Sequence, residues 1–325
     1  MRVLVTGASG YTGARLVERL IVEGHNVRAL VRNPKRAAPL RVLGARVVIG
    51  DVTKRASIAG IAANIDVVYH LVGGLGGGTA AMRQVMVDGT RNLVDQCQAH
   101  AGEHGSLRSF IFTSNAVVYG PGGGAVLNED SPCQPTFPLG RLNLLAEQEL
   151  RRAETEHNLP VTILRLGAIY GPGRLSSALI REGRFRIIGN GRSWISRIHI
   201  DDLLDVLSAL GHAPRPGRLY CLADEEPCAV DDYYRHLADL LGVAPPRHTP
   251  AWYAWLRGRG RYALARLRGR PPFVDANVIG LFTTDLRLDT ARLRTDLDHH
   301  LRYPSYRVGL PAALTAETVA VGTPA

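Results

Sequence analysis

The chain has 325 residues, which exceeds the usual size of one domain and leaves room for a large core with a smaller second lobe. Apolar residues make up 46% of it, and no apolar run approaches the roughly 20 residues that span a bilayer. The formal net charge of +10 is carried almost entirely by arginine, since Lys35 and Lys54 are the only lysines. We expect neither a membrane nor a nucleic acid as a partner, and no signal-peptide pattern precedes the first strand, so a cytoplasmic location is expected.

The cysteines argue against a disulfide framework and against a zinc site. Cys97, Cys133, Cys221 and Cys228 are widely spaced and form no CxxC pair. No metal is therefore expected.

The first half of the chain alternates short apolar runs with helical patterns. The expected strands are 2–6, 26–31, 45–50, 66–72, 109–114 and 161–171, and the expected helices run from Tyr11 to about Glu23, from near Ser57 to Ala63, from near Ala80 to Ala99, and around Leu139. Strands that are apolar throughout and separated by helices indicate a parallel sheet covered on both faces. The pattern predicts an α/β fold with a doubly wound parallel (Rossmann) sheet.

After Gly173 the elements become shorter, and a helix that Asp201 or Asp202 is placed to cap follows "SRIHI". We expect residues 1–172, joined again by 195–222, to form the dinucleotide-binding domain. Residues 173–194 and 223–325 are expected to form a smaller, mostly helical substrate-binding lobe.

Residues 251–272 read "AWYAWLRGRGRYALARLRGRPP" and hold six arginines from Arg257 to Arg270. Basic residues mixed with aromatic ones are found at RNA-binding and anionic lipid-binding surfaces. They are also found in a solvated helix whose aromatic residues cover a substrate cleft, which is the interpretation we favour here.

The segment "VTGASGYTG" follows the first strand and opens the first helix. Its glycines provide a tight turn, a bare backbone beside a pyrophosphate, and close helix–strand packing, and the helix N-terminus attracts the phosphates. The expected cofactor-binding residues of this turn are Gly7, Ser9, Gly10, Tyr11, Thr12 and Gly13.

The second strand predicts which dinucleotide binds. A cofactor with a free ribose 2′-hydroxyl requires an acidic residue at the end of this strand, but the chain runs into Arg32 and Lys35. Both side chains match a 2′-phosphate in charge and hydrogen-bonding capacity, so NADPH is the expected cofactor. Asp51, followed by Val52, ends the third strand and is placed to accept from the adenine amino group.

Six motifs in this order resemble the extended short-chain dehydrogenase/reductases: "TGASGYTG", "GDV", "YHLV", "FTSNAVVYG", "LRLGAIYGPG" and "IHIDDLLDVLSAL". That family includes nucleotide-sugar epimerases and dehydratases, dihydroflavonol reductases and hydroxysteroid dehydrogenases. The resemblance implies further cofactor-lining residues, namely Leu71, Val72 and Gly73 after the fourth strand and Leu166, Gly167, Ala168 and Ile169 along the nicotinamide side.

The chain departs from this family at all three catalytic positions. The family uses a Ser or Thr, a Tyr that gives the proton, and a Lys four residues after the Tyr. Alignment with the family's segments places Asn115, Leu139 and Asn143 at these positions, and residues 121–169 contain neither tyrosine nor lysine. Leu139 does not ionise, and an amide donates hydrogen bonds without releasing a proton at useful pH.

Two kinds of function fit a chain without the triad. The first is an NADPH-dependent ketoreductase acting on a large hydroxylated aromatic ketone, in which a substrate phenol or water supplies the proton and Asn115 donates to the developing oxyanion. The chain resembles the tyrosine-lacking ketoreductases of aromatic polyketide (angucycline-type) biosynthesis. Tyr119 is the second candidate catalytic residue, although its place in a "VYG" shared by relatives with an intact triad favours a structural or substrate-contact role.

The second kind of function is a catalytically inactive NADP-binding sensor or scaffold. A nucleotide-sugar epimerase or dehydratase is a further alternative, but it requires acid–base chemistry that Leu139 does not provide. His199, like Tyr69 and His70, is expected to pack rather than to catalyse. The sequence predicts no oligomeric state.

Overall fold

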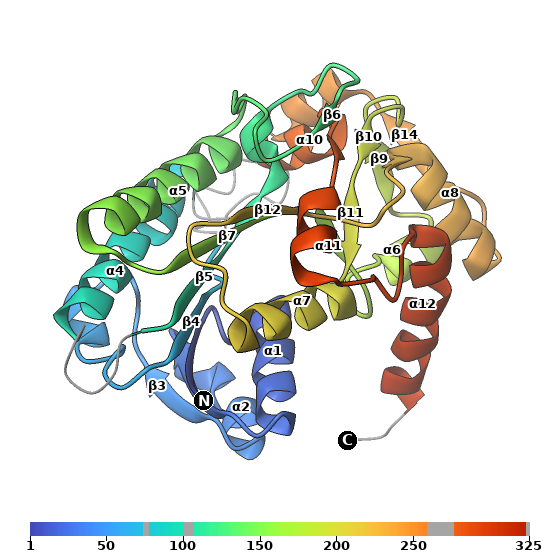
Figure 1. Cartoon of the computed structure of the whole chain (residues 1–325). Helices are drawn as coiled ribbons and strands as arrows, with labels where there is room; N and C mark the ends of the chain where they lie inside the picture. Colours follow the sequence, from blue (N-terminus) through green and yellow to red (C-terminus); the bar gives the residue numbers. More distant parts are fainter. Residues whose placement is uncertain (74–77, 101–106, 259–275, 323–325) are drawn as a thin grey trace. The chain divides into compact units, whose positions relative to one another are not determined.

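The computed structural model describes residues 1–73, 78–100, 107–258 and 276–322 (Figure 1). The chain forms two compact units, each built from several segments. Unit 1 comprises Met1–Ser114, Arg141–Arg165 and Leu204–Tyr220, and unit 2 comprises Asn115–Gly140, Leu166–Leu203 and Cys221–Ala325. The expected lobes divide the chain by function at residue 172. The units divide it by contacts and give Asn115–Gly140 and Leu166–Leu203 to unit 2.

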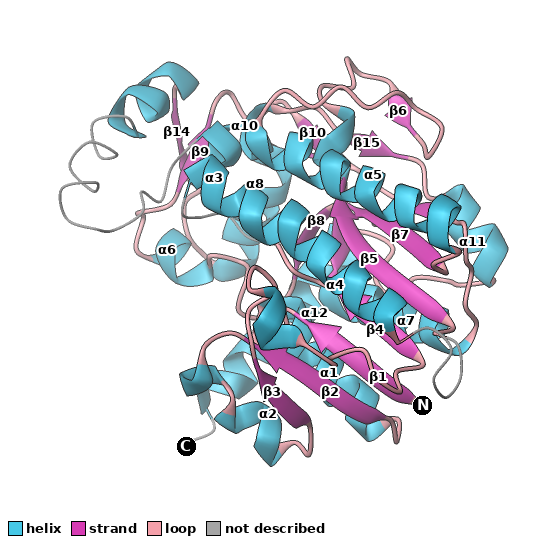
Figure 2. Ribbon diagram, turned by 90° about the vertical axis from the view of Figure 1, so that its left-hand side faces the viewer, coloured by secondary structure: helices cyan, strands magenta, loops and turns pink. Residues whose placement is uncertain are grey.

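Unit 1 is built on a seven-stranded sheet with the order β12-β7-β5-β4-β1-β2-β3. It is doubly wound, as expected from the sequence, and Figure 2 shows its strands from β7 to β3. Every pairing from β5 through β4, β1 and β2 to β3 is parallel. The strands are β1 (Arg2–Thr6), β2 (Asn26–Val31), β3 (Arg46–Ile49), β4 (Val67–His70), β5 (Ser109–Asn115), β7 (Val161–Leu166) and β12 (Leu219–Leu222).

Helices cover both faces of this sheet. Figure 1 shows α4 and α5 on one face and α1 and α7 on the other. The helices that accompany the sheet are α1 (Tyr11–Val22), α2 (Ala38–Val42), α3 (Gly78–Arg83), α4 (Gly89–Ala99), α5 (Pro138–His157) and α7 (Ile200–His212), with short 3₁₀ helices η1 (Pro34–Arg36), η2 (Arg55–Ile58) and η4 (Ala116–Tyr119). Because successive side chains of a strand point to opposite faces, Leu4 of β1 joins the core beneath α4 and α5 while its neighbours face α1 and α7.

Two local expectations are corrected by the structure. No α-helix forms from Ser57 to Ala63, because the 3₁₀ helix η2 ends at Ile58 and Gly60 then takes a positive φ of 69° that a helix does not tolerate. Neither Asp201 nor Asp202 caps α7 from outside, since the helix already begins at Ile200. The Asp202 carboxylate instead accepts from the backbone N–H groups of Arg302 and Tyr303, at 2.7 and 3.0 Å.

The expected long helix from Ala80 to Ala99 is present with one irregularity. Its two α-helical parts, α3 and α4, are joined by a π-helical turn over Gln84–Asp88. Turns of this kind occur often at functional sites.

Unit 2 is assembled from short elements, and most of its described residues beyond Asp224 are helical, as expected. Its helices are α6 (Ser177–Arg181), α8 (Val230–Leu241), α10 (Ala276–Thr283), α11 (Ala291–Leu297) and α12 (Tyr306–Gly322). Its strands are β6 (Val126–Leu127), β8 (Ala168–Tyr170), β9 (Arg186–Ile188), β10 (Trp194–Ile195), β11 (Arg197–His199), β13 (Cys228–Ala229), β14 (Arg247–Thr249) and β15 (Arg287–Leu288). β8 and β11 pair in parallel, with Arg197 opposite Ala168.

Among the described residues, no helix is both long and apolar enough to cross a membrane. Residues 251–258 of the basic and aromatic stretch are helical, with Trp252 and Trp255 exposed. The arginines from 259 onward lie outside the described residues.

Candidate functional site

The glycine turn after β1 leaves no room for side chains. A Cβ atom on Gly13 would lie 2.2 Å from the carbonyl oxygen of Gly7, and one on Gly7 would lie 2.7 Å from that of Leu71. Gly7 also has a positive φ of 69°, and Gly10 is the N-cap of α1. The turn therefore brings bare backbone and the first-turn amides of a helix to one place, which is the chemistry that a pyrophosphate requires.

A pocket of about 210 Å³ in unit 1 opens beside this turn. Most of the expected cofactor residues of unit 1 line it, together with four residues that the sequence did not single out as ligands. The lining comprises Gly7, Ser9, Gly10, Leu30, Arg32, Arg36, Gly50, Asp51, Val52, Leu71, Val72, Gly73 and Val85. Among the expected residues, Tyr11, Thr12, Gly13 and Lys35 do not line it.

The basic residues of this pocket differ in part from those expected. Arg32 and Arg36 line it, whereas Lys35 is exposed on η1, where its backbone N–H donates to the Asn33 side chain at 3.1 Å. The 3₁₀ turn carries Lys35 and Arg36 in different directions, which the linear sequence did not reveal. Asp51 uses one carboxylate oxygen, Oδ1, to hold Thr53 through both its N–H and its hydroxyl, each at 2.9 Å.

The side chains of Tyr11 and His70 contact other side chains of unit 1. The Arg15 guanidinium lies 4.1 Å from the centre of the Tyr11 ring. His70 is fully buried, its ring nitrogens contact the hydroxyls of Thr6 at 2.7 Å and Thr90 at 2.9 Å, and burial lowers its pKa to about 3. The neutral imidazole therefore links β1, β4 and α4 and packs, as expected.

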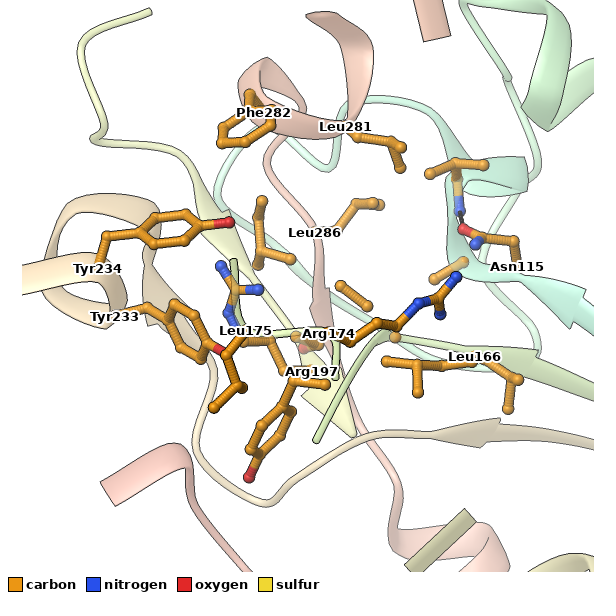
Figure 3. Close-up of a pocket in the computed structure, with 18 residues that line it drawn as sticks. Asn115, Leu166, Arg174, Leu175, Arg197, Tyr233, Tyr234, Leu281, Phe282 and Leu286 are labelled. Carbon is orange, nitrogen blue, oxygen red and sulfur yellow. Dashed lines mark hydrogen bonds between the residues drawn. The ribbon is translucent and has the colours of Figure 1, made fainter. Parts of the chain in front are cut away.

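Unit 2 contains a second pocket, of about 200 Å³, shown in Figure 3. It brings together Asn115 and the four residues Leu166–Ile169 that were expected along the nicotinamide side. Its other lining residues are Ala116, Val117, Tyr170, Arg174, Leu175, Ile195, Ser196, Arg197, Tyr233, Tyr234, Leu281, Phe282 and Leu286. None of the described residues that line it is acidic.

Asn115 is held by the end of its own strand. Its side-chain oxygen accepts from the backbone N–H of Val117 at 3.0 Å and so caps η4. Because the oxygen is occupied in this way, the amide nitrogen is the group that Asn115 can offer to a ligand. This is the polarity that an oxyanion donor requires.

Two arginines reach this pocket from opposite sides. Figure 3 shows the Arg174 guanidinium extending toward Asn115, while that of Arg197 lies beside Tyr233 and Tyr234. The Arg197 guanidinium carbon lies 3.6 Å from the centre of the Tyr233 ring and 5.7 Å from that of Tyr234. The pocket is thus basic as well as aromatic.

The residues at the missing Tyr and Lys positions do not line this pocket. Leu139 is buried in unit 2, and its backbone N–H donates to the side-chain oxygen of Asn277 at 2.8 Å. Asn143 is buried in unit 1. Neither side chain therefore contributes to the lining of this pocket.

Tyr119 also lies outside the pocket. It is buried, and its hydroxyl lies 3.1 Å from the Cys221 thiol sulfur. This contact fits the structural role that its place in "VYG" favours. His199 is buried between the rings of Tyr170 and Tyr303, and burial lowers its pKa to about 4, so it packs as expected.

A buried ion pair occupies unit 1 one helical turn beyond Asn143. The Glu147 carboxylate accepts from Nε and Nη2 of Arg165, with a shortest distance of 2.7 Å, and it also accepts from the Ser114 hydroxyl. The two charged side chains are only 7% and 4% exposed. Their mutual neutralisation makes this pair structural.

No metal was expected from the sequence, but one group of side chains in unit 1 has the residue types that bind metal ions. Glu23, His25 and His212 bring ligand atoms within 4.8 Å of one another. The Glu23 carboxylate already accepts from Arg19 and from Ser208, each at 2.7 Å. These hydrogen bonds hold the Glu23 carboxylate within unit 1.

Several residues that line the unit 2 pocket were not predicted from the sequence, although the sequence contains weak indications of some of them. Arg197 stands in "ISRIHI", where a charged residue interrupts a buried strand pattern, and such an interruption predicts a functional or paired charge. Tyr233 and Tyr234 follow "DD" at the start of an amphipathic helix and read only as a core face. Their convergence with Phe282 of α10 required the tertiary structure.

Comparison with known proteins gives a consistent result. Residues 3–222 match the model of the family described as "NAD dependent epimerase/dehydratase family". The chain is 32% identical over 327 residues to a 3-diazoavenalumate denitrifying reductase from a Streptomyces species, with 95% of this chain and 99% of that protein covered. It is 30% identical over 270 residues to a 3-beta-hydroxysteroid dehydrogenase of Mycolicibacterium neoaurum, with 75% of this chain and 71% of that protein covered.

Solved structures support the same fold. UDP-glucuronic acid 4-epimerase from Bacillus cereus in complex with NAD superposes with a TM-score of 0.75 at 20% identity, with 98% of this chain and 99% of that one covered. Three observations indicate the same family. They are the glycine turn, the doubly wound sheet and the family match over most of unit 1. The chain therefore belongs to the NAD-dependent epimerase/dehydratase family of the extended short-chain dehydrogenase/reductases, whose members are NAD(P)-dependent oxidoreductases and epimerases.

Proposed function

We propose that this protein is an NADPH-dependent reductase that acts on an aromatic substrate whose reduction needs no acid from the protein. The observation that carries this proposal is the lining of the unit 2 pocket. It combines an amide donor, two arginines and four aromatic rings, and it contains neither a carboxylic acid nor a histidine among the described residues. Three of the rings are tyrosines, Tyr170, Tyr233 and Tyr234, and burial raises the pKa of each phenol. The positions of the family's Tyr and Lys hold Leu139 and Asn143, which do not line it.

The preference for NADPH rests on two basic residues in the unit 1 pocket. Arg32 and Arg36 both line it, and a guanidinium is suited to a phosphate monoester because it donates two parallel hydrogen bonds. Asp51, the acidic residue that lines the same pocket, holds Thr53 through Oδ1. A ribose 2′-phosphate therefore finds complementary charge in this pocket.

Bound NADPH supplies a hydride. The protein's own contribution is to bind and orient the substrate and to stabilise the charge that develops on it. The Asn115 amide nitrogen is placed to donate to an oxygen that gains negative charge, and one such donor is worth about 10²–10³ in rate. Aromatic walls exclude water and strengthen that hydrogen bond.

The first substrate class is the hydroxylated aromatic ketone expected from the sequence. A phenol hydrogen-bonded to the reacting carbonyl has a pKa near the value of about 10 of a tyrosine, so the substrate carries its own acid. A pocket of about 200 Å³ favours one or two rings over a large polycycle, since a cavity of roughly 150 Å³ already binds benzene. The polyketide substrate remains a prediction.

The second class is an aromatic diazo compound, which one specific observation favours. The relative that matches 95% of this chain is named a 3-diazoavenalumate denitrifying reductase. When hydride replaces N₂ on an aryl diazonium carbon, a C–H bond forms, and the electron pair of the breaking C–N bond leaves with N₂. No proton is consumed, so this reaction requires none of the missing triad.

A paired assay tests the proposal. NADPH consumption is measured with an ortho-hydroxyaryl ketone and with an ortho-hydroxyaryl diazo compound, and N₂ release is measured for the latter. We expect NADPH-dependent turnover of one class and a loss of about 10²–10³ in Asn115→Ala for the ketone. Methylating the ketone's phenol is expected to stop reduction while leaving binding nearly unchanged. Reduction of the methylated ketone at the normal rate would show that the acid comes from the protein or bulk water.

The assay also separates the alternatives. A chain that binds NADPH tightly and turns over neither class is the sensor or scaffold. Turnover of a UDP- or dTDP-sugar would establish the epimerase or dehydratase alternative and overturn the reductase proposal, because that chemistry requires an acid–base group at a sugar hydroxyl.

A further inference from the structure

Arg197 occupies an unusual position in unit 2. It lies on β11 opposite Ala168, and the residue is only 8% exposed although it lines the pocket. Its Nε–H is buried and has no hydrogen-bond partner within the described residues. Its guanidinium stacks on the Tyr233 ring and hydrogen-bonds the Cys228 thiol.

The charge of Arg197 is not neutralised by an ion pair. Within residues 1–73, 78–100, 107–258 and 276–322, every buried carboxylate–arginine ion pair involves another arginine. Asp224 interacts with Arg197 electrostatically without forming an ion pair with it, and burial raises its pKa to about 8. An uncompensated buried charge costs several kcal/mol, and proteins keep such charges chiefly where a ligand completes them.

The surroundings of Arg197 indicate the shape of the missing partner. Tyr234 lies nearly parallel to Phe282, with an interplanar angle of 16° and centroids 6.2 Å apart, and Tyr233 stands nearly perpendicular to Tyr234 at 5.1 Å. Figure 3 shows these rings along one side of the pocket, with the Arg197 guanidinium among them. A flat apolar group carrying one anionic end matches this arrangement.

We propose that Arg197 binds the carboxylate of a small aromatic ligand whose ring packs against Tyr233, Tyr234 and Phe282. The guanidinium is suited to a carboxylate because its planar fork donates two parallel hydrogen bonds. Arg174, which is exposed and lies toward Asn115, has the lesser role of attracting the anion. This inference rests on the proposed function in taking the unit 2 pocket as the substrate pocket, and it names the substrate class as aromatic carboxylates.

Calorimetric titration of the full chain without NADPH tests this proposal. The probes are cinnamate and 2-naphthoate, each paired with its neutral primary amide. Wild type is expected to bind each carboxylate at least about tenfold more tightly than its amide. Arg197→Met keeps most of the apolar stem. It is expected to abolish this preference because it weakens binding of the carboxylate and leaves binding of the amide unchanged.

Two further variants give matched controls. Arg192→Met removes an exposed arginine of the same unit that does not line the pocket, and it should leave the preference unchanged. Arg197→Lys keeps the charge and loses the fork, so it should retain part of the preference. If Arg197→Met does not fold, thermal unfolding of wild type and Arg197→Lys still tests the preference, because at equal concentration the more tightly bound ligand raises Tm more.

Three outcomes would overturn the proposal. In the first, wild type binds the acid and the amide equally. In the second, Arg197→Met keeps the preference for the acid. In the third, wild type binds UDP, and Arg197→Met loses UDP binding while it still binds cinnamate. The last result would assign Arg197 to a diphosphate. Because binding is measured without NADPH, carboxylate binding with no turnover would defeat the reductase proposal and leave this one standing.

Discussion

Arg165 and Arg197 are both buried, and they differ in how their charge is satisfied. In unit 1, the Arg165 guanidinium donates to the Glu147 carboxylate through two nitrogens, and Ser114 completes the carboxylate. In unit 2, Arg197 contacts aromatic faces and a thiol and lines a pocket. Unit 1 neutralises its buried charge with its own residues, whereas unit 2 leaves a buried charge for a ligand.

This contrast distinguishes a structural charge from a ligand-binding one. Burial alone does not separate the two arginines, since both are more than nine-tenths buried. What separates them is the partner. A bidentate carboxylate offsets the desolvation cost of Arg165, whereas Arg197 has ring faces and a thiol in place of a carboxylate.

The largest expected effect is on the paired charge. Glu147→Gln leaves Arg165 buried beside a neutral amide, and we expect the free energy of unfolding to fall by about 3–5 kcal/mol in urea titrations. Arg197→Met removes a charge that has no carboxylate partner, so it should leave stability unchanged or raise it. An equal loss in the two variants would show that Arg197 is neutralised within the folded chain.

The next largest effect is a pH dependence of the free energy of unfolding, and it arises from Asp224 near Arg197. Asp224 faces Tyr170, Asp202, Arg197 and the backbone N–H of His199, and burial raises its pKa to about 8. An unfolded aspartate has a pKa of about 3.9, so between these two values the folded chain holds a proton that the unfolded chain has released. Stability contributed by this group is therefore complete below about pH 4 and is lost as the pH rises toward about 8.

Asp224→Asn removes this titration. We expect wild type to lose about 1 kcal/mol or more of unfolding free energy between about pH 6 and pH 8, and the variant to show a flatter profile. The measurement is urea unfolding at a series of pH values. Parallel profiles for the two proteins would show that Asp224 is ionised throughout that range.

A smaller effect concerns exposed cations, which solvent screens. Arg32→Ala and Arg36→Ala are each expected to weaken NADPH binding by about tenfold with little change for NADH, measured by fluorescence titration of both cofactors. Lys35→Ala is the matched control, because Lys35 is exposed on the same 3₁₀ turn and does not line the pocket. Equal affinity of wild type for NADPH and NADH would remove the basis of this prediction.

The smallest effect is expected from restoring the family's residues. Leu139→Tyr with Asn143→Lys should give no large gain in reduction rate, because neither position lines the unit 2 pocket. Steady-state kinetics with the best substrate of the paired assay measure this. A gain of about 10²-fold or more, the usual contribution of a general acid, would show that the restored tyrosine reaches the reacting atom.

The sequence by itself determined the architecture of unit 1. The apolar strands, the glycine turn and the helix that follows it are local patterns, because strand and helix periodicity and the steric need for glycine act over a few residues. Gly7 and Gly13 were identified in this way, and the backbone atoms 2.2–2.7 Å from their would-be side chains explain why. The sequence alone also showed that the family's catalytic Tyr and Lys are absent.

Only the tertiary structure decided which residues share a pocket. Arg36 replaces Lys35 in the unit 1 lining because a short 3₁₀ helix turns the chain, and Tyr119 and Leu139 are directed into packing, away from the unit 2 pocket. Arg197, Tyr233 and Phe282 come from β11, α8 and α10, which are separated by tens of residues. Their meeting depends on long-range packing, and whether a buried charge is structural or awaits a ligand depends on the neighbours that such packing provides.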